Sequence, residues 1–305
     1  MARILIHEVG PRDGLQVEGQ VVPTETKLDW LARLIGSGVD IVQVGSFVHP
    51  EKVPQMADTD ELFRRLTAEQ RGPRAVLSGL VLNEKGLERG LNCGVELFCL
   101  GVSASETHSR RNTGMGTDDA TRRIIAMALE AKRSGREVQV SVQSAFGCGF
   151  EGVVPEDRVM GIVAAYLAAG LDAISLADTA GHAHPAQVSA YVRRILTMEP
   201  AARITAHLHN TYGLGMANVY AALDAGATSI ESSFGGLGGC PFTKVAAGNV
   251  ATEDVVHGLQ RAGHRTDIRL DVLIDVARGV ATFFGRDLPG CVYKIGPITA
   301  GAPAS

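Results

Sequence analysis

The stretch Gly38-Val39-Asp40-Ile41-Val42-Gln43-Val44-Gly45 runs from the end of an expected helix directly into a short apolar strand. Its first glycine supplies the left-handed conformation with which many helices end. Comparable glycine-led triplets lie at three other helix-to-strand junctions, namely Gly94-Val95-Glu96, Gly170-Leu171-Asp172 and Gly226-Ala227-Thr228. The four triplets precede the second, fourth, sixth and eighth expected strands, which indicates stacked modules of two strands and two helices.

Short apolar runs alternate with longer helical patterns along the whole chain. The expected strands cover residues 4–9, 41–45, 75–81, 95–100, 137–143, 173–177, 204–208 and 229–233. The expected helices lie near residues 24–35, 59–69, 84–91, 118–132, 155–169, 185–199, 215–225 and 252–262. Continuous apolar strands between helices are typical of a parallel sheet covered on both faces. The sequence therefore predicts an α/β fold, a single (β/α)8 TIM-type barrel over residues 1–285, with a short C-terminal extension over residues 286–305.

The composition of the 305-residue chain is that of an ordinary globular protein, with 45% hydrophobic and 20% charged residues. The net charge of −4 and the lack of a basic run argue against a nucleic-acid partner, because phosphate binding needs clustered cations. No apolar stretch reaches the roughly 18 residues expected of a membrane span. The five cysteines form no CxxC pair and the N-terminus shows no signal or transit pattern, so we expect a cytoplasmic protein.

Active groups of such a barrel lie at the C-terminal ends of the strands and in the loops that follow them. The seventh strand ends in His207-Leu208-His209-Asn210, and alternate residues of a strand point to the same side. Two imidazoles in register favour a metal site, with a pair of hydrogen-bonded core histidines as the alternative. The first strand delivers Arg12 and Asp13 on a turn, which taken alone also fits a solvated ion pair. Asp13 would complete a set of two histidines and one carboxylate, which suits Mn²⁺, Mg²⁺ or a non-redox ion like Fe²⁺.

The loop after the eighth strand is rich in glycine. Its segment Gly235-Gly236-Leu237-Gly238-Gly239-Cys240 carries one thiol among four glycines. It lacks the Lys-Ser/Thr ending of a phosphate-binding loop. We therefore expect a lid that places Cys240 over the site, with the amide oxygen of Asn249 within reach of a metal. Asp178, at the end of the sixth strand, offers one more carboxylate.

Motifs between about residue 3 and residue 285 follow one another in a characteristic order: Glu8-Val9-Gly10-Pro11-Arg12-Asp13-Gly14-Leu15-Gln16, Ser46-Phe47-Val48-His49-Pro50, Val53-Pro54-Gln55-Met56, Ser105-Glu106, Gly147-Cys148, Asp178-Thr179, His207-Leu208-His209-Asn210-Thr211-Tyr212-Gly213, Gly236-Leu237-Gly238-Gly239-Cys240-Pro241 and Gly248-Asn249-Val250-Ala251-Thr252-Glu253-Asp254. In this combination the chain resembles the 3-hydroxy-3-methylglutaryl-CoA lyase family. The resemblance implies a metal-dependent (β/α)8 lyase, related to isopropylmalate-type synthases, that cleaves a 3-hydroxyacyl-CoA by retro-Claisen chemistry. For the family's namesake the products are acetyl-CoA and acetoacetate.

The same resemblance implies roles for individual residues. The ligands of a divalent cation, Mg²⁺ or Mn²⁺, would be Asp13, His207, His209 and Asn249. Three catalytic residues are implied: Arg12, Cys240 and Asp178. Arg12 would stabilise the enolate, and Cys240 would serve in proton transfer. The acyl-CoA substrate would be contacted by Gln16, Gln43, Ser46, Ser105 and Thr179.

Four positions depart from the family pattern. Gln43 stands where the family has Glu, Ser141 where an aromatic is expected, Gly149 where it has Pro, and Asn210 where it has Asp. We therefore expect a thioester other than the namesake to be preferred, with unchanged specificity as the alternative.

Two further functions stay open at this point. One is a Claisen-type synthase, although synthases usually carry C-terminal domains for which few residues remain here. The other is a catalytically weakened barrel retained as a metal-binding or scaffolding protein. A homodimer is expected from barrel enzymes generally.

Overall fold

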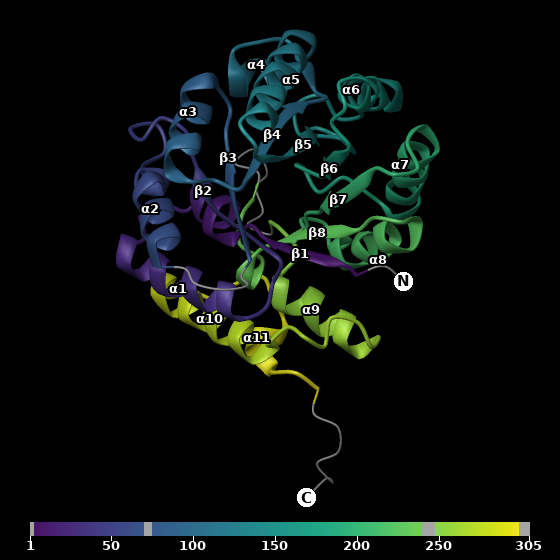
Figure 1. Cartoon of the computed structure of the whole chain (residues 1–305). Helices are drawn as coiled ribbons and strands as arrows, with labels where there is room; N and C mark the ends of the chain where they lie inside the picture. The colour runs from purple at the N-terminus through teal and green to yellow at the C-terminus, as the bar shows by residue number, and fades with distance from the viewer. Residues whose placement is uncertain (1–2, 70–74, 240–247, 299–305) are drawn as a thin grey trace, which may run out of the picture.

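The computed structural model describes residues 3–69, 75–239 and 248–298. Its centre is a closed barrel of eight parallel strands that follow one another in sequence order (Figure 1). They are β1 (Leu5–Glu8), β2 (Ile41–Ser46), β3 (Val76–Leu80), β4 (Leu97–Ser103), β5 (Glu137–Gln143), β6 (Ala173–Ala177), β7 (Arg203–His207) and β8 (Ser229–Ser232). Residue-for-residue pairing of β1 with β8 closes the ring. The predicted (β/α)8 barrel is thus confirmed.

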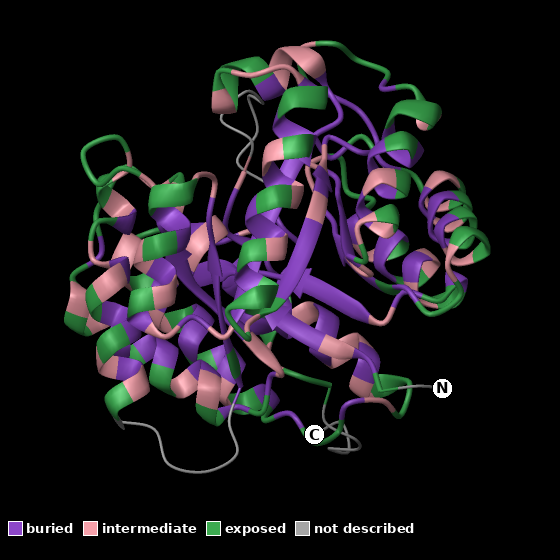
Figure 2. Ribbon diagram, turned by 45° about the horizontal axis from the view of Figure 1, so that its top comes forward, coloured by how far each residue is buried: buried purple, intermediate pink, exposed green. Residues whose placement is uncertain are grey.

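Helices surround this barrel on the outside (Figure 1). They are α1 (Thr24–Gly36), α2 (Thr59–Glu69), α3 (Glu84–Cys93), α4 (Glu106–Thr113), α5 (Thr117–Arg133), α6 (Glu156–Ala168), α7 (Pro185–Met198), α8 (Gly215–Ala225), α9 (Thr252–Arg261), α10 (Leu270–Phe284) and α11 (Val292–Ile295). Helix α5 shows why they pack there: Ile124, Met127, Ala128 and Ala131 form one buried face at helical spacing. Figure 2 shows the strands buried and the outer helix faces exposed.

Three helices were not predicted from the sequence, namely α4, α10 and α11. Helix α10 packs against α1, α9 and α11, so it belongs to the outer layer of helices. Helix α11 buries Val292 and Tyr293, and the domain boundary at residue 285 stays a prediction. Among the described residues no helix is long and apolar enough to cross a membrane.

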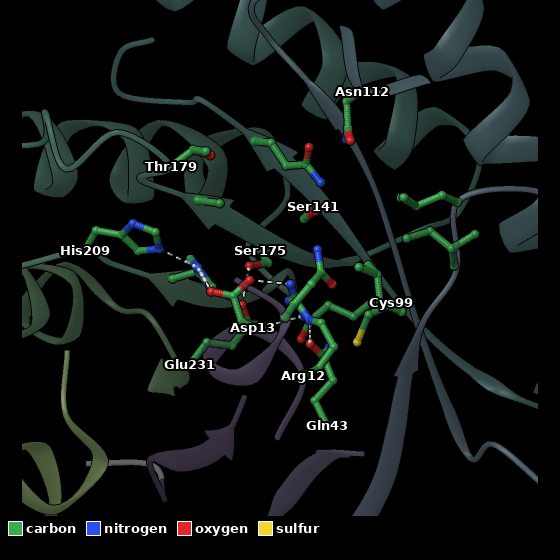
Figure 3. A pocket seen from close by; sticks show the side chains of 18 of the residues that line it. Arg12, Asp13, Gln43, Cys99, Asn112, Ser141, Ser175, Thr179, His209 and Glu231 are labelled. Carbon is green, nitrogen blue, oxygen red and sulfur yellow. Dashed lines mark hydrogen bonds and ion pairs between the residues drawn. The ribbon is translucent and has the colours of Figure 1, made fainter. Parts of the chain in front are cut away.

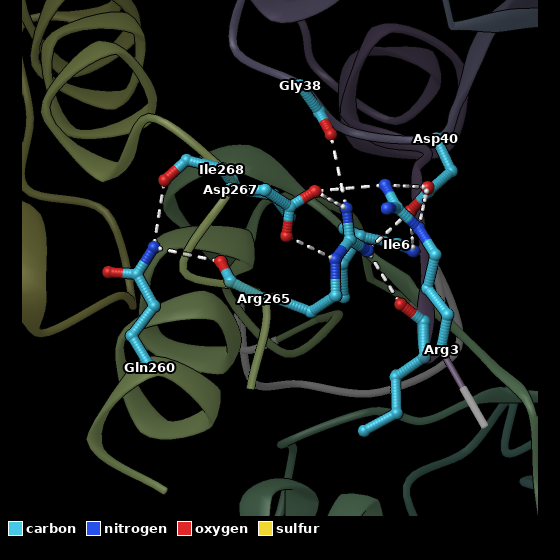
Figure 4. A network of polar contacts seen from close by, with 9 residues as sticks. Arg3, Ile6, Gly38, Asp40, Gln260, Arg265, Asp267 and Ile268 are labelled. Carbon is cyan, nitrogen blue, oxygen red and sulfur yellow. Dashed lines mark hydrogen bonds and ion pairs between the residues drawn. The ribbon is translucent and has the colours of Figure 1, made fainter. Parts of the chain in front are cut away.

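An ion-pair cluster braces the N-terminal ends of β1 and β2 (Figure 4). Arg265, in the loop between α9 and α10, donates hydrogen bonds to the carbonyl oxygens of Ile4 (2.6 Å) and Gly38 (3.2 Å). The same guanidinium pairs with Asp40 at 2.5 Å and with Asp267 at 3.0 Å. Arg3 reaches the same two carboxylates from the surface. This cluster ties the α9–α10 loop to the bottom of the barrel.

Candidate active site

The chain turns tightly where it leaves β1. The Val9 carbonyl accepts hydrogen bonds from the backbone N–H groups of Arg12 (3.1 Å) and Asp13 (2.7 Å) in the π-helical turn η1 (Gly10–Gly14). Gly10 is required because a Cβ there would lie 2.6 Å from Glu8 Oε1 and 2.7 Å from the Phe234 ring. Single π-turns often occur at functional sites. Here the turn directs Arg12 and Asp13 into the central pocket (Figure 3).

A buried carboxylate holds this turn in place. Glu8 accepts hydrogen bonds from the backbone N–H groups of Gly10 (2.6 Å) and Phe234 (3.0 Å) and from the Thr252 hydroxyl (2.6 Å). Phe234 begins the short helical turn η3 (Phe234–Gly236), and Thr252 begins α9. Burial raises the pKa of Glu8 to about 7. Glu8 thus joins the loops that follow β1 and β8, which carry the predicted catalytic groups.

Three side chains converge at the mouth of the barrel. The ligand atoms of Asp13, His207 and His209 lie within 4.8 Å of one another. The two histidine Nε2 atoms are 3.1 Å apart, and His207 Nε2 lies 3.8 Å from Asp13 Oδ2. Neighbouring nitrogen ligands of a metal, bonded at roughly 2.0–2.1 Å, are separated by about this distance. The candidate metal site predicted from the sequence is therefore assembled in the fold.

The charge states of two of these groups also suit a cation. Despite its burial, Asp13 has a pKa lowered to about 2 by the charges of Arg12, His207 and His209. Burial, with the His207 charge beside it, lowers the pKa of His209 to about 3. Metal binding requires an ionised carboxylate and a neutral imidazole. Both forms are the ones favoured near neutral pH.

Asn249 supplies an independent test of the fit. Its Nδ2 donates to Asp13 Oδ2 at 2.7 Å and to the Leu237 carbonyl at 3.0 Å, which fixes the orientation of the amide. Its Oδ1 is buried and has no hydrogen-bond partner in the described structure. A buried polar atom left unpaired is costly, and a bound cation would satisfy it. Asp13, His207 and His209 therefore fit a divalent cation that prefers oxygen and imidazole ligands, and the ligand role of Asn249 stays a prediction.

Arg12 is held between an amide and a carboxylate. Its Nε donates to Gln43 Oε1 and its Nη1 to Asp13 Oδ1. The β2–β3 register shifts between Gln43 and Gly45, and such bulges re-aim side chains beside active sites. Sequence alternation alone does not reveal this shift. The position where the family has Glu thus contacts the guanidinium directly, through an uncharged amide.

A cavity of about 290 Å³ opens between these groups and the strand ends. Among the predicted substrate contacts, Gln16, Gln43 and Thr179 line it. Two others lie outside its lining: Ser46 is buried in β2, and Ser105 caps α4 by accepting the His108 N–H at 3.2 Å. The roles predicted for all five stay predictions.

The two remaining predicted catalytic residues lie away from the cavity lining or outside the described chain. Asp178 accepts hydrogen bonds from the backbone N–H groups of His182 (2.8 Å) and Ala183 (3.2 Å), and burial raises its pKa to about 7. It therefore holds the loop after β6, and its catalytic role stays a prediction. Cys240 lies outside the described residues.

Sequence reasoning missed several polar residues of the cavity wall. They come from the barrel interior and from α4: Cys99, His108, Asn112, Gln139, Gln143, Ser175 and Glu231. Glu231 is the most consequential, because its Oε2 lies 2.7 Å from His207 Nδ1. In the parallel pairing of β7 with β8, His207 lies directly opposite Glu231. The expected adjacency of these two strands is the sequence signal that could have identified Glu231.

The fold and the site together define a (β/α)8 barrel with a candidate two-histidine, one-carboxylate metal site at its mouth. The model of the HMGL-like family matches residues 3–280. The chain belongs to the HMGL-like family.

Named relatives cover almost the whole chain. The hydroxymethylglutaryl-CoA lyase of Bacillus subtilis is 35% identical over 94% of this chain and 95% of its own length. The (R)-citramalyl-CoA lyase of Chloroflexus aurantiacus is 38% identical over 98% of this chain and 96% of its own. A solved structure of an HMG-CoA lyase from Acinetobacter baumannii in complex with coenzyme A and 3-methylmalate has a TM-score of 0.91 and 36% identity, covering 99% of this chain and 98% of its own. These relatives place the protein among the carbon–carbon lyases.

Proposed function

We propose that this protein cleaves a 3-hydroxy-3-methylacyl-CoA that carries a carboxylate, releasing acetyl-CoA and a keto acid. The observation that carries the proposal is the convergence of Asp13, His207 and His209 beside the Arg12 guanidinium in one cavity. The named relatives act on two such thioesters, hydroxymethylglutaryl-CoA and (R)-citramalyl-CoA. A Mg²⁺ or Mn²⁺ ion is the cofactor that the ligand set favours.

The reaction breaks the bond between C2 and C3 of the thioester. The 3-hydroxyl loses its proton, C3 becomes the carbonyl of the keto acid, and the electron pair of the broken bond moves into a thioester enolate. C2 of the enolate then takes up a proton to give acetyl-CoA. The cation, when bound, acidifies the hydroxyl and orients the substrate.

Arg12 is the group of this chain that stabilises the enolate in the proposal. Its fork is fixed by Gln43 and Asp13 before substrate arrives, so no reorganisation is needed when negative charge develops. Preorganised donors of this kind commonly supply the largest single contribution to catalysis.

Gln43 favours the citramalyl-CoA type of substrate over hydroxymethylglutaryl-CoA. An amide leaves Asp13 as the anion that contacts Arg12, so the site is about one charge more positive than with a Glu at this position. Citramalyl-CoA carries its carboxylate directly on the carbinol carbon, one methylene closer to the breaking bond. Its charge therefore falls nearer the guanidinium. The keto acid from this substrate is pyruvate, whereas hydroxymethylglutaryl-CoA gives acetoacetate.

The direct test is turnover by metal-depleted protein, before and after addition of Mg²⁺ or Mn²⁺. Hydroxymethylglutaryl-CoA, (R)-citramalyl-CoA and malyl-CoA would be supplied separately, with acetyl-CoA and each keto acid measured. We expect metal-dependent cleavage and the highest kcat/KM for (R)-citramalyl-CoA. Cleavage of hydroxymethylglutaryl-CoA in preference to the others would overturn the substrate assignment. Metal binding without cleavage of any thioester would favour the scaffolding alternative, and net condensation of acetyl-CoA with a keto acid the synthase alternative.

Cys240 is proposed as the proton donor to C2, carried by the glycine-rich loop. Burial, reinforced by Asp60, raises the pKa of Cys93 to about 11, and burial with the nearby Glu231 charge raises that of Cys99 to about 12. Those two thiols should therefore alkylate slowly, whereas Cys291 is exposed and provides an internal control. We expect substrate to protect Cys240 from iodoacetamide and to leave Cys291 reactive. Wild-type turnover by Cys240→Ser would refute the assignment.

Two broader expectations complete the proposal. The protein acts in the cytoplasm, where reduced thiols and acyl-CoA substrates coexist. It forms a homodimer, which light scattering of the purified protein would test.

A further inference from the structure

The barrel interior beneath the candidate metal site is polar. The centre of such a barrel is usually filled by branched apolar side chains. Here β1, β5, β6, β7 and β8 instead place buried polar residues there, namely His7, Gln139, Ser175, Thr205 and Glu231. A buried polar group is tolerated only when it is hydrogen-bonded, so this layer calls for an explanation.

Glu231 contacts three other members of this layer, Gln139, Ser175 and His7. Its Oε2 is 2.7 Å from His207 Nδ1 and 3.4 Å from the Ser175 hydroxyl. Its Oε1 accepts a hydrogen bond from Gln139 Nε2 at 2.5 Å and lies 3.3 Å from His7 Nδ1. Gln139 faces Glu231 with its amide nitrogen, because its Oε1 already accepts a hydrogen bond from the Thr205 hydroxyl at 3.1 Å. Glu231 is therefore the acceptor in this contact. Four polar groups from four strands therefore converge on one carboxylate.

We propose that Glu231 is a positioning residue that keeps the His207 proton on Nδ1 and so presents the Nε2 lone pair to the cation. The inference rests on the metal site of the proposed function. The His207 Nδ1–Glu231 contact and the 3.1 Å approach of His207 Nε2 to His209 Nε2 lie on opposite sides of one imidazole. A proton cannot occupy Nε2 and leave that atom free to bind a metal.

Position 231 requires a carboxylate because an ionised carboxylate carries no hydrogen-bond donor. A glutamine of the same shape carries two N–H donors, and the groups around position 231 already include the Gln139 amide and two imidazoles. If the new amide faced His207, Nδ1 would have to accept, and the proton would move to Nε2. Partners that orient a metal-ligating histidine typically contribute about 10- to 100-fold to metal affinity. The acceptor character of Glu231 is thus what the site uses.

The test compares Glu231→Gln with the wild type. Mn²⁺ titration by calorimetry should show affinity weakened by about 10- to 100-fold. Turnover of the variant should recover as the Mn²⁺ concentration is raised, which a damaged fold would not allow. Nitrogen-15 NMR of the wild-type histidines adds a measurement that needs no variant: His207 should carry its proton on Nδ1.

Ser78→Ala is the matched control. Ser78 is buried in the same interior and bonds His7 Nε2 at 2.8 Å, but it does not touch His207. We expect Mn²⁺ affinity close to the wild type in this variant. Equal loss in both variants, unchanged affinity in Glu231→Gln, or a wild-type His207 protonated on Nε2 would overturn the inference. Wild-type protein that binds no Mn²⁺ at all would instead overturn the metal site of the proposed function.

Discussion

Arginine and aspartate meet at both ends of the barrel, with different degrees of hydrogen bonding. At the N-terminal end, all three nitrogens of Arg265 donate hydrogen bonds, and its side chain is 3% exposed. At the C-terminal mouth, Arg12 donates through Nε and Nη1, and its Nη2 makes no hydrogen bond with the described residues. Its side chain is 12% exposed, into the cavity. A guanidinium with every nitrogen occupied stabilises the fold, whereas one with a free nitrogen in a cavity can bind a ligand.

The largest expected effect is on Arg12. A lysine keeps the charge but loses the planar fork that Gln43 and Asp13 hold. Arg12→Lys should lower kcat by about 100- to 1,000-fold, as removal of a preorganised oxyanion donor does. Steady-state kinetics on (R)-citramalyl-CoA gives the effect, and urea denaturation should show an unchanged midpoint. A matching fall in stability would mean that the two clusters do not differ in function.

Arg265 should show the opposite behaviour. Replacing it by Met leaves Asp40 and two carbonyl oxygens without their buried partner, which should cost about 3–5 kcal/mol in the free energy of unfolding. The kcat of the folded fraction should be unchanged. Arg3→Met is the control, because Arg3 contacts the same Asp40 and Asp267 from solvent. Its denaturation midpoint should stay close to the wild type, and an equal loss would contradict the importance of burial.

Glu253, which accepts a hydrogen bond from the Gly235 backbone N–H, should make the stability of the protein depend on pH. Burial raises the pKa of Glu253 to about 8, so the folded state favours the protonated, neutral carboxyl. The contribution of this group to stability is therefore lost as the pH rises through 8. From pH 5 to 8 the wild type should lose stability relative to Glu253→Gln, by up to about 1.4 kcal/mol per pH unit. Parallel pH profiles of the two proteins in chemical denaturation would show that Glu253 does not titrate in this range.

The smallest expected effect is a change in substrate preference on substitution of Gln43. Gln43→Glu places a second carboxylate against Arg12, and should reduce the preference for (R)-citramalyl-CoA over hydroxymethylglutaryl-CoA by up to roughly tenfold, or 1.4 kcal/mol. Gln143→Glu adds the same charge to the same cavity, and Gln143 makes no hydrogen bond with Arg12 in the described structure. An equal shift in the ratio of kcat/KM for both variants would assign the effect to net charge rather than to the Arg12 contact.

The strands and the candidate metal cluster of Asp13, His207 and His209 could be predicted because their signals are local. Each of the eight strands is a short apolar run, and His207 and His209 share a face by simple alternation. Helix α10 was missed because no strand precedes it, although its buried Leu273, Ile274 and Ala277 have helical spacing.

Other features of the site depend on distant parts of the chain. The contact of Gln43 with Arg12 depends on a register shift between β2 and β3, which propensity does not encode. In the sequence, Glu231 is a single charged residue within an apolar strand. Its contact with His207 depends on the pairing of β8 with the neighbouring β7. Asp178 has the composition of an active-site acid, yet its carboxylate is engaged by backbone N–H groups of its own loop.

The claim that the mouth of the barrel is a metal site is tested most directly with His209→Ala. His209 Nδ1 has no hydrogen-bond partner in the described structure, and its Nε2 contacts His207, so its removal leaves the Glu231 network intact. Metal analysis and chemical denaturation would be run on the same preparation. We expect loss of bound Mn²⁺ and of turnover, with an unfolding midpoint at or near the wild-type value. Full Mn²⁺ occupancy in His209→Ala would contradict it.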